Sequence, residues 1–392
     1  MSAMIVGVDY TAAAWQGAGI GRYTRELIDA ATVRDPAIRY VLFYAATGLP
    51  AASPHIAALR RLCAERPNVR AVPIPLHPRQ LTIIWQRVRL PLLVELFTGR
   101  LDLLHAPDFV LPPTRAKTLL TVHDLTFLVH PECAEPALAR YLSRVVPRAL
   151  RRADLVLVDS QATAVDLHSL LDVAASRTRL IYPGVAPRFR PLERAAIEPL
   201  RARLGLPPRF LLFVSTLEPR KNLVRLLEAF AQVDGGLNAA HRPSSTVHRL
   251  DLVIAGRRGW RYEPIFAAVE RLGLGERVRF LDFVADEDLP ALYNLAEAFV
   301  YPSIYEGFGL PALEALACSV PVMTAQVSSL PEVVGAAAVL VDPLDVGSIA
   351  RGIARTLAEA ARLRQAGPQQ AASFSWEASA DALLACYREL CS

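Results

Sequence analysis

The sequence predicts an α/β protein of two domains, each built around a parallel β-sheet. Its 392 residues exceed the size at which one hydrophobic core usually stops growing, so two domains of about 180 to 200 residues are expected. Short apolar runs alternate with longer segments of helical period, which is typical of parallel strands covered by helices on both faces. The apolar share of 53% and the charged share of 21% exclude a largely disordered chain.

The first half of the chain, residues 1–190, has the alternation that a Rossmann-like domain requires. Helical period is found at residues 21–31 and 141–150. Five apolar runs are predicted to be strands, at residues 4–10, 40–45, 101–107, 117–124 and 153–160. Because these runs are apolar on both faces, we expect a sheet buried between two layers of helices.

The second half restarts the pattern after a connection marked by prolines. Pro183, Pro187 and Pro191 exclude a continuous helix there, so the domain boundary is expected near residue 190. A helix is predicted at 222–232 and a loop at 235–249. Strands are predicted at 209–218, 250–256, 277–284, 298–303 and 320–325. The pattern predicts a second Rossmann-like domain at 191–373, followed by a helix at 374–392.

Cysteine usage and apolar run lengths indicate a compartment. The five cysteines form no C-x-x-C pair and no Cys/His cluster at metal-ligand spacing, which favours reduced thiols. The first residues lack a charged segment before a long apolar stretch, and no window reaches the roughly 18 apolar residues of a membrane span. We therefore expect a cytoplasmic protein that is neither secreted nor transmembrane.

The charge balance favours anionic partners. The formal net charge is +5, and nearly all basic residues are arginines, because Lys117 and Lys221 are the only lysines. Phosphorylated small molecules and anionic membrane surfaces both suit such a protein. Nucleic acid is not an expected partner, because the arginines are spread through the chain and aromatic residues make up only 7% of it.

The most specific motif lies at residues 303–318, where Glu306 and Glu314 flank a turn between a predicted strand and a predicted helix. Pro311 suits the first helical turn, where no backbone N–H is needed. The loop that enters this helix consists of Gly307, Phe308, Gly309 and Leu310. Free backbone N–H groups at a helix start favour a diphosphate, and the glycines allow close approach.

The two carboxylates would repel phosphate, so they are predicted to accept hydrogen bonds from neutral hydroxyl groups. Glu306 would bind a hexose and Glu314 a ribose. The alternative is an ordinary glycine turn with two solvated glutamates. Arg220 and Lys221 are adjacent cations at another helix start, where they oppose the helix dipole unless an anion is bound. A solvated basic turn is the alternative for that pair.

Three glycines, Gly17, Gly19 and Gly21, lie between the first strand and the first helix and resemble a dinucleotide-binding loop. The third glycine falls one position too early for the G-x-G-x-x-G pattern, which disfavours a nicotinamide dehydrogenase.

Strand ends supply further candidates, because open α/β sheets bind ligands there. His123 and Asp124 end one predicted strand, and His105 and Asp108 follow another. For each histidine a purely structural role is the alternative. The second half adds candidates for donor binding at a strand end and at a base-stacking edge, namely Gly256, Phe283 and Val284.

Over nearly its whole length the chain resembles glycosyltransferase family 4, whose members are retaining enzymes of the GT-B fold. The E-x7-E motif of that family matches Glu306 to Glu314, and its cationic pair matches Arg220 and Lys221. The combinations TLEPRKNL, AGRRGW and FSWE resemble the bacterial mannosyltransferases of surface polysaccharide assembly.

The resemblance implies two parallel sheets that face an interdomain cleft, with the last helix returning to the first domain. The N-terminal glycine loop of the family matches Gly17 to Gly21, and its acceptor-side histidine matches His123. Gly19 would contact the donor, whereas Gly17, Gly21 and Asp124 would lie on the acceptor side. The C-terminal domain would hold a nucleotide sugar and the N-terminal domain most of the acceptor.

The family also implies a chemistry. Arg220 and Lys221, with the backbone amides after Glu306, would neutralise the departing diphosphate, as a divalent metal does in other glycosyltransferases. The resemblance therefore implies that neither a metal nor another cofactor is required. His123 would stabilise an oxocarbenium-like transition state, and the leaving phosphate would help to deprotonate the acceptor on the same face. No protein nucleophile is assigned.

GDP-mannose is the expected donor, ahead of UDP-sugars and GDP-fucose, and the acceptor is expected to be a glycan or a lipid-linked sugar. The alternatives are a UDP-sugar enzyme of the same fold, an epimerase or phosphorylase, and a non-catalytic nucleotide-sugar sensor or scaffold. Residues 79–100 combine apolar faces with arginines, a pattern that fits the inner face of an anionic membrane. A helix packed on the first domain is the alternative for this segment.

Overall fold

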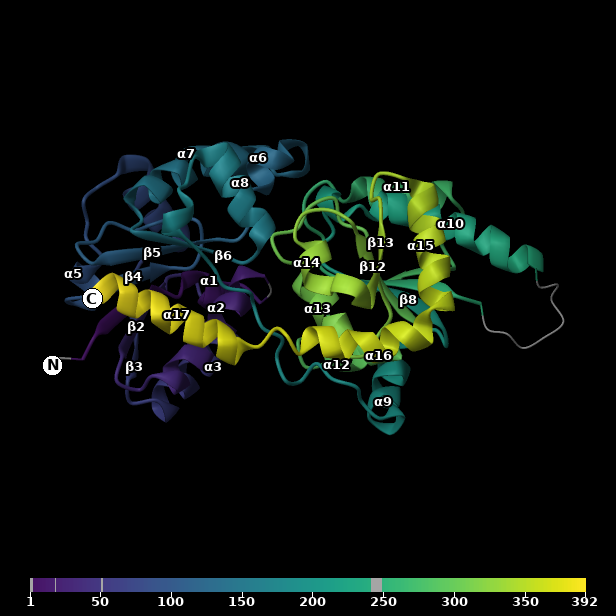
Figure 1. The fold of residues 1–392 in the computed structure, drawn as a ribbon, viewed down its shortest axis with the longest axis horizontal. Coiled ribbons are helices and arrows are strands. Elements are labelled where there is room, and N and C mark those ends of the chain that lie inside the picture. The colour runs from purple at the N-terminus through teal and green to yellow at the C-terminus, as the bar shows by residue number, and fades with distance from the viewer. Residues whose placement is uncertain (1–2, 18, 51, 241–248) are drawn as a thin grey trace. The chain divides into compact units, whose positions relative to one another are not determined.

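The computed structural model describes residues 3–17, 19–50, 52–240 and 249–392, and within them the chain forms two compact units (Figure 1). The first unit contains Met1–Leu125, Ala137–Gly184 and Ser375–Ser392. The second contains Thr126–Pro136 and Val185–Phe374. The chain thus leaves the first unit after Gly184, near the expected boundary, but the short segment Thr126–Pro136 belongs to the second unit.

The first unit is built on a parallel sheet. In its described residues seven strands follow the order β3-β2-β1-β4-β5-β6-β7, and every neighbouring pair is parallel. The strands are β1 (Ile5–Asp9), β2 (Arg39–Ala45), β3 (Val69–Ile74), β4 (Leu103–Ala106), β5 (Lys117–Val122), β6 (Leu155–Val158) and β7 (Thr178–Leu180). Strands β4 and β6 are buried along their whole length, as the continuous apolar runs predict.

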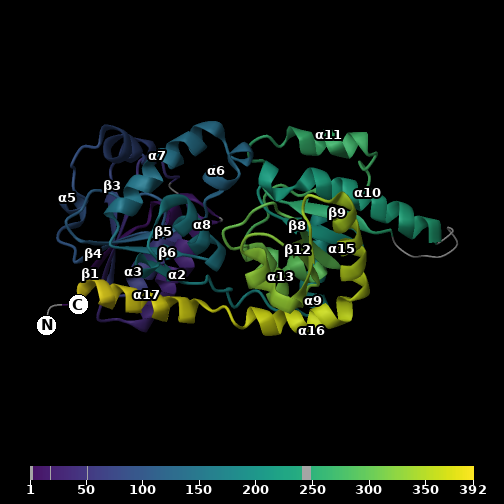
Figure 2. The same cartoon turned by 45° about the horizontal axis from the view of Figure 1, so that its top comes forward.

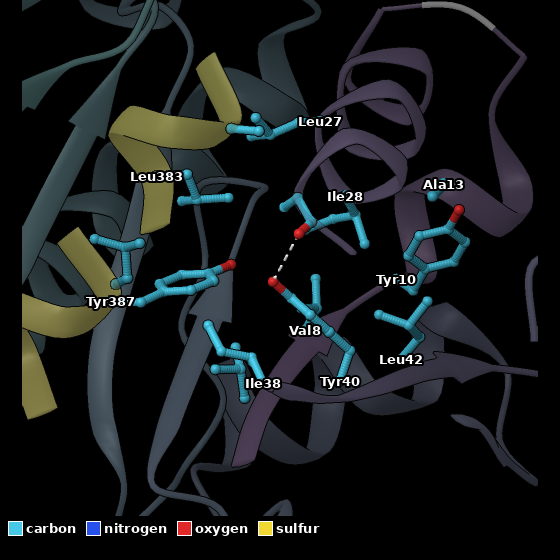
Figure 3. Packing of buried hydrophobic residues seen from close by; sticks show 14 of the residues in the cluster. Val8, Tyr10, Ala13, Leu27, Ile28, Ile38, Tyr40, Leu42, Leu383 and Tyr387 are labelled. Carbon is cyan, nitrogen blue, oxygen red and sulfur yellow. Dashed lines mark hydrogen bonds between the residues drawn. The ribbon is translucent and has the colours of Figure 1, made fainter. Parts of the chain in front are cut away.

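The described part of the first unit also contains helices and helical turns. They are α1 (Thr11–Trp15), α2 (Ile20–Arg34), α3 (Pro54–Glu65), α4 (Pro78–Leu81), the π-helix Thr82–Val88, α5 (Glu95–Thr98), α7 (Pro136–Arg152), α8 (Gln161–Leu171), the 3-10 turn Ala175–Arg177 and α17 (Trp376–Cys391). The last helix, α17, packs against α2 and contacts β4 and β5 (Figure 2). Figure 3 shows Leu383 and Tyr387 of α17 in the same core as Val8 of β1 and Leu27 of α2. The C-terminal segment therefore completes the first core.

The second unit has a sheet of the Rossmann order. Its described strands follow the order β10-β9-β8-β11-β12-β13, and all neighbours are parallel. The strands are β8 (Phe210–Val214), β9 (Asp251–Ala255), β10 (Val278–Phe280), β11 (Ala298–Tyr301), β12 (Val322–Ala325) and β13 (Ala338–Val341). The strand order reverses between β8 and β11, and ligands bind at such a switch point in open α/β sheets.

The helices of the second unit form two groups, and each helix contacts at least one other helix of its own group. One group is α10 (Leu223–Ala240), α11 (Glu263–Arg271) and α15 (Val346–Ala358). The other is α9 (Arg194–Leu204), α12 (Leu289–Leu295), α13 (Leu310–Ala317), α14 (Leu330–Val334) and α16 (Ala360–Ala371). Four short pieces complete the unit: α6 (Thr126–Val129) and the 3-10 turns Pro131–Cys133, Pro219–Lys221 and Gly335–Ala337.

Capping side chains explain several helix starts. Ser160 Oγ accepts a hydrogen bond from the N–H of Thr163 at 3.1 Å, ahead of α8. Ser375 Oγ accepts from the N–H of Ala378 at 3.1 Å, ahead of α17. Each hydroxyl satisfies a backbone donor that the helix itself leaves without a partner.

The end of α10 differs from the prediction. A loop was expected over 235–249, but the helix continues to Ala240, and residues 241–248 lie outside the described residues. Gly235 and Gly236 do not end the helix, because a glycine in a helix interior costs only about 1 kcal/mol, which the rest of an 18-residue helix can offset.

Candidate active site

Arg220 and Lys221 meet Glu306 at the switch point of the second sheet. The cations follow β8, and Glu306 follows β11. Lys221 Nζ donates to Glu306 Oε1 at 2.6 Å, and Arg220 Nη1 donates to Glu306 Oε2 at 2.7 Å. The anion that compensates the two cations is therefore a side chain of the chain itself, which the local sequence did not reveal. Both oxygens of Glu306 accept a charged hydrogen bond.

A second layer of contacts fixes this cluster. Lys221 Nζ also donates to the hydroxyl of Tyr301 at 2.7 Å, and Arg220 Nε lies 2.7 Å from Glu218 Oε1. Lys221 and Glu306 are both about 5% exposed. Burial raises the pKa of Glu306, but Arg220 and Lys221 lower it more, so that the net pKa is about 2. Glu306 is ionised throughout the physiological pH range.

The loop after Glu306 enters α13 as predicted from Pro311. Gly309 precedes the helix with φ of 100°, a backbone conformation that favours glycine. A Cβ atom at this position would lie 2.7 Å from Leu330 Cδ2, so the loop packs closely on the start of α14. Gly307, Phe308 and Gly309 are buried, whereas Leu310 is partly exposed.

Glu314 lies in α13 and does not join the Glu306 cluster. Its carboxylate accepts a hydrogen bond from the Tyr293 hydroxyl of α12 at 3.1 Å, and the residue is 2% exposed. Neither glutamate is solvated, so the interpretation of two solvated glutamates is wrong. The predicted ribose contact of Glu314 stays a prediction.

The other donor candidates of the second unit occupy the ends of β9 and β10. Gly256 has φ of 150°, and a Cβ atom there would lie 1.7 Å from the Ser215 carbonyl oxygen, so backbone packing alone requires a glycine. Phe283 is 51% exposed, and the Arg257 guanidinium lies 4.3 Å from the centre of its ring. Val284 is partly exposed. An exposed aromatic face beside a cation suits the stacking of a base.

In the first unit, His123 is held at both ring nitrogens. Nδ1 lies 2.5 Å from Asp159 Oδ2, and Nε2 lies 2.8 Å from the Pro107 carbonyl oxygen. Because a carbonyl only accepts, Nε2 carries a proton. Burial lowers the pKa of His123, but Asp159 and the Pro107 carbonyl raise it more, to about 9. The ring is therefore a buried imidazolium at neutral pH.

His105 has the structural role that the sequence left open. Its ring is fully buried between the Tyr387 hydroxyl of α17, at 2.9 Å, and the Thr121 hydroxyl, at 3.1 Å. Burial lowers its pKa to about 3, so the ring stays neutral. Asp108 and Asp124 are each partly buried near the ends of β4 and β5.

The N-terminal glycines lie between α1 and the first turn of α2. Gly19 is exposed and precedes α2, Gly21 is buried in its first turn, and Gly17 is partly exposed. Arg25 of α2 fixes this turn, because its Nη2 donates to the Gly17 carbonyl at 2.9 Å. Ala18 lies outside the described residues. Contacts of these glycines with a donor or acceptor stay predictions.

Sequence reasoning missed four residues that support the candidate site. Tyr301 holds Lys221, and Asp159 holds His123. The other two are Ser328 and Ser329, which bond the backbone of Glu306. Asp159 ends a predicted strand, as His123 does, so strand-end position was a usable signal. No local signal identifies Tyr301, because an aromatic residue in an apolar strand is usually a core residue.

The segment Thr126–Pro136 lies on the second unit close to Tyr305. Trp260 Nε1 donates to the Cys133 carbonyl at 2.8 Å, and Arg261 Nη1 donates to the Glu132 carbonyl at 2.8 Å. The His130 ring packs edge-on against the ring of Tyr305. A stretch from the first half of the sequence is thus bound next to Glu306.

Residues 79–100 do not form one packed amphipathic helix. They form the end of α4, the π-helix Thr82–Val88, an irregular stretch and α5. Trp85 and Val94 are buried, whereas Val88 is 60%, Leu90 50% and Leu96 69% exposed. No helix in the described part of the chain is long and apolar enough to cross a membrane.

Among the residues that the structure describes, no group of three or more His, Cys, Asp or Glu side chains is arranged to hold a metal ion. Metal-independent catalysis remains a prediction.

The two halves of the chain match two family models. Residues 17–189 match Glycosyltransferase Family 4, and residues 197–372 match Glycosyl transferases group 1. The O-antigen chain mannosyltransferase B of Escherichia coli is 36% identical over 279 residues, which cover 70% of each chain. The serotype-specific mannosyltransferase WbdA of Escherichia coli is 32% identical over 269 residues, which cover 66% of this chain and 32% of that protein. The chain therefore spans only about a third of WbdA.

Solved structures with the same architecture cover nearly the whole chain. Sucrose-phosphate synthase from Thermosynechococcus elongatus has a TM-score of 0.74 and 23% identity, with 99% of each chain covered. Anabaena HepE in complex with UDP and glucose has a TM-score of 0.72 and 20% identity, with 98% of this chain and 99% of that chain covered. The fold is therefore GT-B, and the chain belongs to the glycosyltransferases described by the family 4 and group 1 models.

Proposed function

We propose that this glycosyltransferase is a retaining enzyme that moves mannose from GDP-mannose to a glycan or lipid-linked acceptor. The observation that carries the proposal is the buried cluster of Arg220, Lys221 and Glu306 at the switch point of the second sheet. The similarity of the chain to two mannosyltransferases of Escherichia coli supports the choice of mannose.

The cluster fits a diphosphate leaving group. Arg220 and Lys221 supply two positive charges in a buried setting, where electrostatic interactions are stronger than in water. A diphosphate would bind these cations together with the backbone N–H groups after Glu306, which lead into α13. Because the charges are already held in place, little reorganisation is needed as charge develops on the leaving group.

Glu306 would bind a hexose hydroxyl as an ionised acceptor. Its net pKa of about 2 keeps it charged, and each carboxylate oxygen retains a lone pair beside its bond to a cation. The same bonds to Lys221 and Arg220 reduce its strength as a nucleophile. They support same-face attack with the leaving phosphate as the base, without a covalent intermediate on Glu306.

His123 would act through its charge. Both ring nitrogens are engaged by Asp159 and Pro107, so the ring is poorly placed to accept a proton from an acceptor. A fixed imidazolium would repel the positive charge of an oxocarbenium-like sugar, so we assign His123 to the negative charge that develops on the departing group and not to the sugar cation.

Donor and stereochemistry are tested by one transfer experiment. The purified enzyme is incubated with labelled GDP-mannose, UDP-glucose or GDP-fucose, with and without a chelator, and with a glycolipid extract as acceptor. Of the three donors, we expect only GDP-mannose to give labelled product, and we expect the chelator to leave this transfer unchanged. NMR of the product should show the anomeric configuration of the donor. Transfer from UDP-glucose alone would favour the UDP-sugar alternative, while inverted product would contradict the retaining mechanism.

We propose further that residues 79–100 bind an anionic lipid surface. Val88, Leu90 and Leu96 are exposed apolar side chains, and Arg87 and Arg89 are exposed beside them. Apolar side chains next to arginines suit the boundary between headgroups and acyl chains. This position would bring a lipid-linked acceptor to the enzyme.

Vesicle sedimentation tests this surface. We expect binding to vesicles with anionic lipid, weaker binding at high salt, and little binding to neutral vesicles. Leu90→Asp and Leu96→Asp together should abolish it, whereas Leu170→Asp, at an exposed leucine of α8, should not. Equal binding of both variants would contradict the proposal.

A further inference from the structure

Two adjacent serines after β12 hold the backbone of the Glu306 loop. Ser328 Oγ accepts a hydrogen bond from the Glu306 N–H at 2.9 Å. Ser329 Oγ lies 3.0 Å from the Glu306 carbonyl oxygen and 2.9 Å from the Phe308 carbonyl oxygen, and its proton is shared between them. Ser329 is fully buried. The loop is thus pinned at three backbone atoms by side chains outside it.

Ser329 makes these bonds instead of capping its own helix. It is the residue that precedes α14, yet its side chain makes no capping bond there. Serines in the same position before α8 and α17 do cap their helices, which is the usual role of serine at a helix start. The hydroxyl of Ser329 is committed to the Glu306 loop at the expense of local helix stability.

Ser328 adopts a backbone conformation that side chains disfavour. Its φ is 49°, in the left-handed region that favours glycine. Residues kept in such a conformation concentrate at functional sites, where surrounding contacts compensate the strain. Its bond to the Glu306 N–H is the contact that a glycine at position 328 could not make.

The pinned carbonyls set the direction of two backbone donors. In a trans peptide the carbonyl and the following N–H point to opposite sides, and no cis peptide is found in the described residues. With the carbonyls of Glu306 and Phe308 directed at Ser329, the N–H groups of Gly307 and Gly309 point away from it. Two neighbouring backbone N–H groups that both point away from Ser329 can together bind an anion.

We infer that Ser328 and Ser329 are positioning residues of the donor site, which hold the N–H groups of the Glu306 loop ready for the diphosphate. This inference rests on the proposed function. It assigns the two serines to binding of the donor diphosphate, and hence to the KM for the donor and to the affinity for free nucleoside diphosphate.

The test compares Ser329→Ala, Ser328→Ala and Ser328→Gly with wild type, using GDP in titration calorimetry and GDP-mannose in turnover. The control is Thr356→Val, because the buried Thr356 hydroxyl donates to the Gly352 carbonyl at 2.8 Å inside α15. Losing one buried hydrogen bond corresponds to about tenfold in an equilibrium constant. We expect Ser329→Ala to raise the Kd for GDP about tenfold, and Thr356→Val to leave it unchanged.

Ser328→Gly separates positioning from stability. It relieves the left-handed strain, so its Tm should exceed that of Ser328→Ala, while both variants should bind GDP equally weakly. GDP affinity that follows Tm across the serine variants, or stays at the wild-type value, would overturn the inference. A wild-type protein that binds neither GDP nor UDP would instead contradict the proposed function; if it binds UDP, the same comparison is made with UDP.

Discussion

Glu306 is the residue that joins Arg220 and Lys221. Burying a carboxylate and two cations costs several kcal/mol per ion in lost hydration, which their mutual attraction offsets only with good geometry. Here the oxygens lie 2.6 Å from Lys221 Nζ and 2.7 Å from Arg220 Nη1. Hydrophobic residues of similar volume often stabilise a fold as well as a buried ion pair does, so fold stability does not explain the cluster, and it agrees with the donor binding that we propose.

His123 should make stability depend on pH. Its folded pKa of about 9 lies above the ordinary value of 6.5. The stabilisation that protonated His123 gives to the folded state is therefore complete below pH 6.5 and is lost as pH rises through 9. The difference corresponds to about 3 kcal/mol in the free energy of unfolding. Urea unfolding at several pH values should show this decline in wild type and not in His123→Gln.

His168→Gln is the matched control, because His168 of α8 is exposed. It should retain the wild-type decline. A decline of wild-type size in His123→Gln would show that the imidazolium bound to Asp159 is not its source.

The sequence pattern selected the charged residues of the candidate site but not their partners. The motif and strand-end arguments selected Arg220, Lys221, Glu306 and His123 from local pattern. They did not show that Glu306 itself neutralises the pair, because that contact joins residues 85 and 86 positions apart. Pairings across a sheet depend on strand order, which local sequence does not contain.

Among the elements, α17 has a structural role far from its neighbours in sequence. Leu383 is fully buried, and the Tyr387 hydroxyl bonds the buried His105 ring. The helix contacts α2, β4 and β5 of the first unit. Its burial predicts that the first unit does not reach full stability without the last residues of the chain.

Leu383→Ala should therefore destabilise the first unit by about 2–5 kcal/mol, because it removes buried methyl groups and leaves a cavity. Hydrogen exchange of the β4 and β5 amides reports that unit alone. Leu170→Ala, at a leucine that is 48% exposed, should change the unfolding free energy by no more than about 0.5 kcal/mol. Equal exchange rates in the two variants would refute the assignment of α17 to this core.

Most strands could be predicted because each is a short apolar run between helices. The run 153–160, for example, contains β6, which is wholly buried. Two features of the fold could not be predicted from the sequence. The π-helix Thr82–Val88 has no distinctive sequence period, and the binding of Thr126–Pro136 to the second unit depends on Trp260 and Arg261, more than a hundred positions away.

At the scale of the whole molecule, both units repeat one arrangement, a parallel sheet whose strand order reverses beside the first strand of the unit. In the second unit this places Arg220, Lys221 and Glu306 together. The two α/β domains were predictable because they depend on the periodicity of apolar residues. The family was predictable because its motifs each lie within one half of the chain. Donor, acceptor and stereochemistry depend on contacts with molecules that the sequence does not describe.

The most direct test of the central claim is thermal stabilisation of wild type, Lys221→Ala and Lys117→Ala by GDP-mannose, GDP-fucose and UDP-sugars. Lys117 is the other lysine of the chain and is exposed in β5. A ligand bound only by the folded protein raises its Tm. We predict that GDP-mannose stabilises wild type and Lys117→Ala, with or without chelator, and fails to stabilise Lys221→Ala. Stabilisation that persists in Lys221→Ala, or no response of wild type to any nucleotide sugar, would contradict a donor site at Arg220, Lys221 and Glu306.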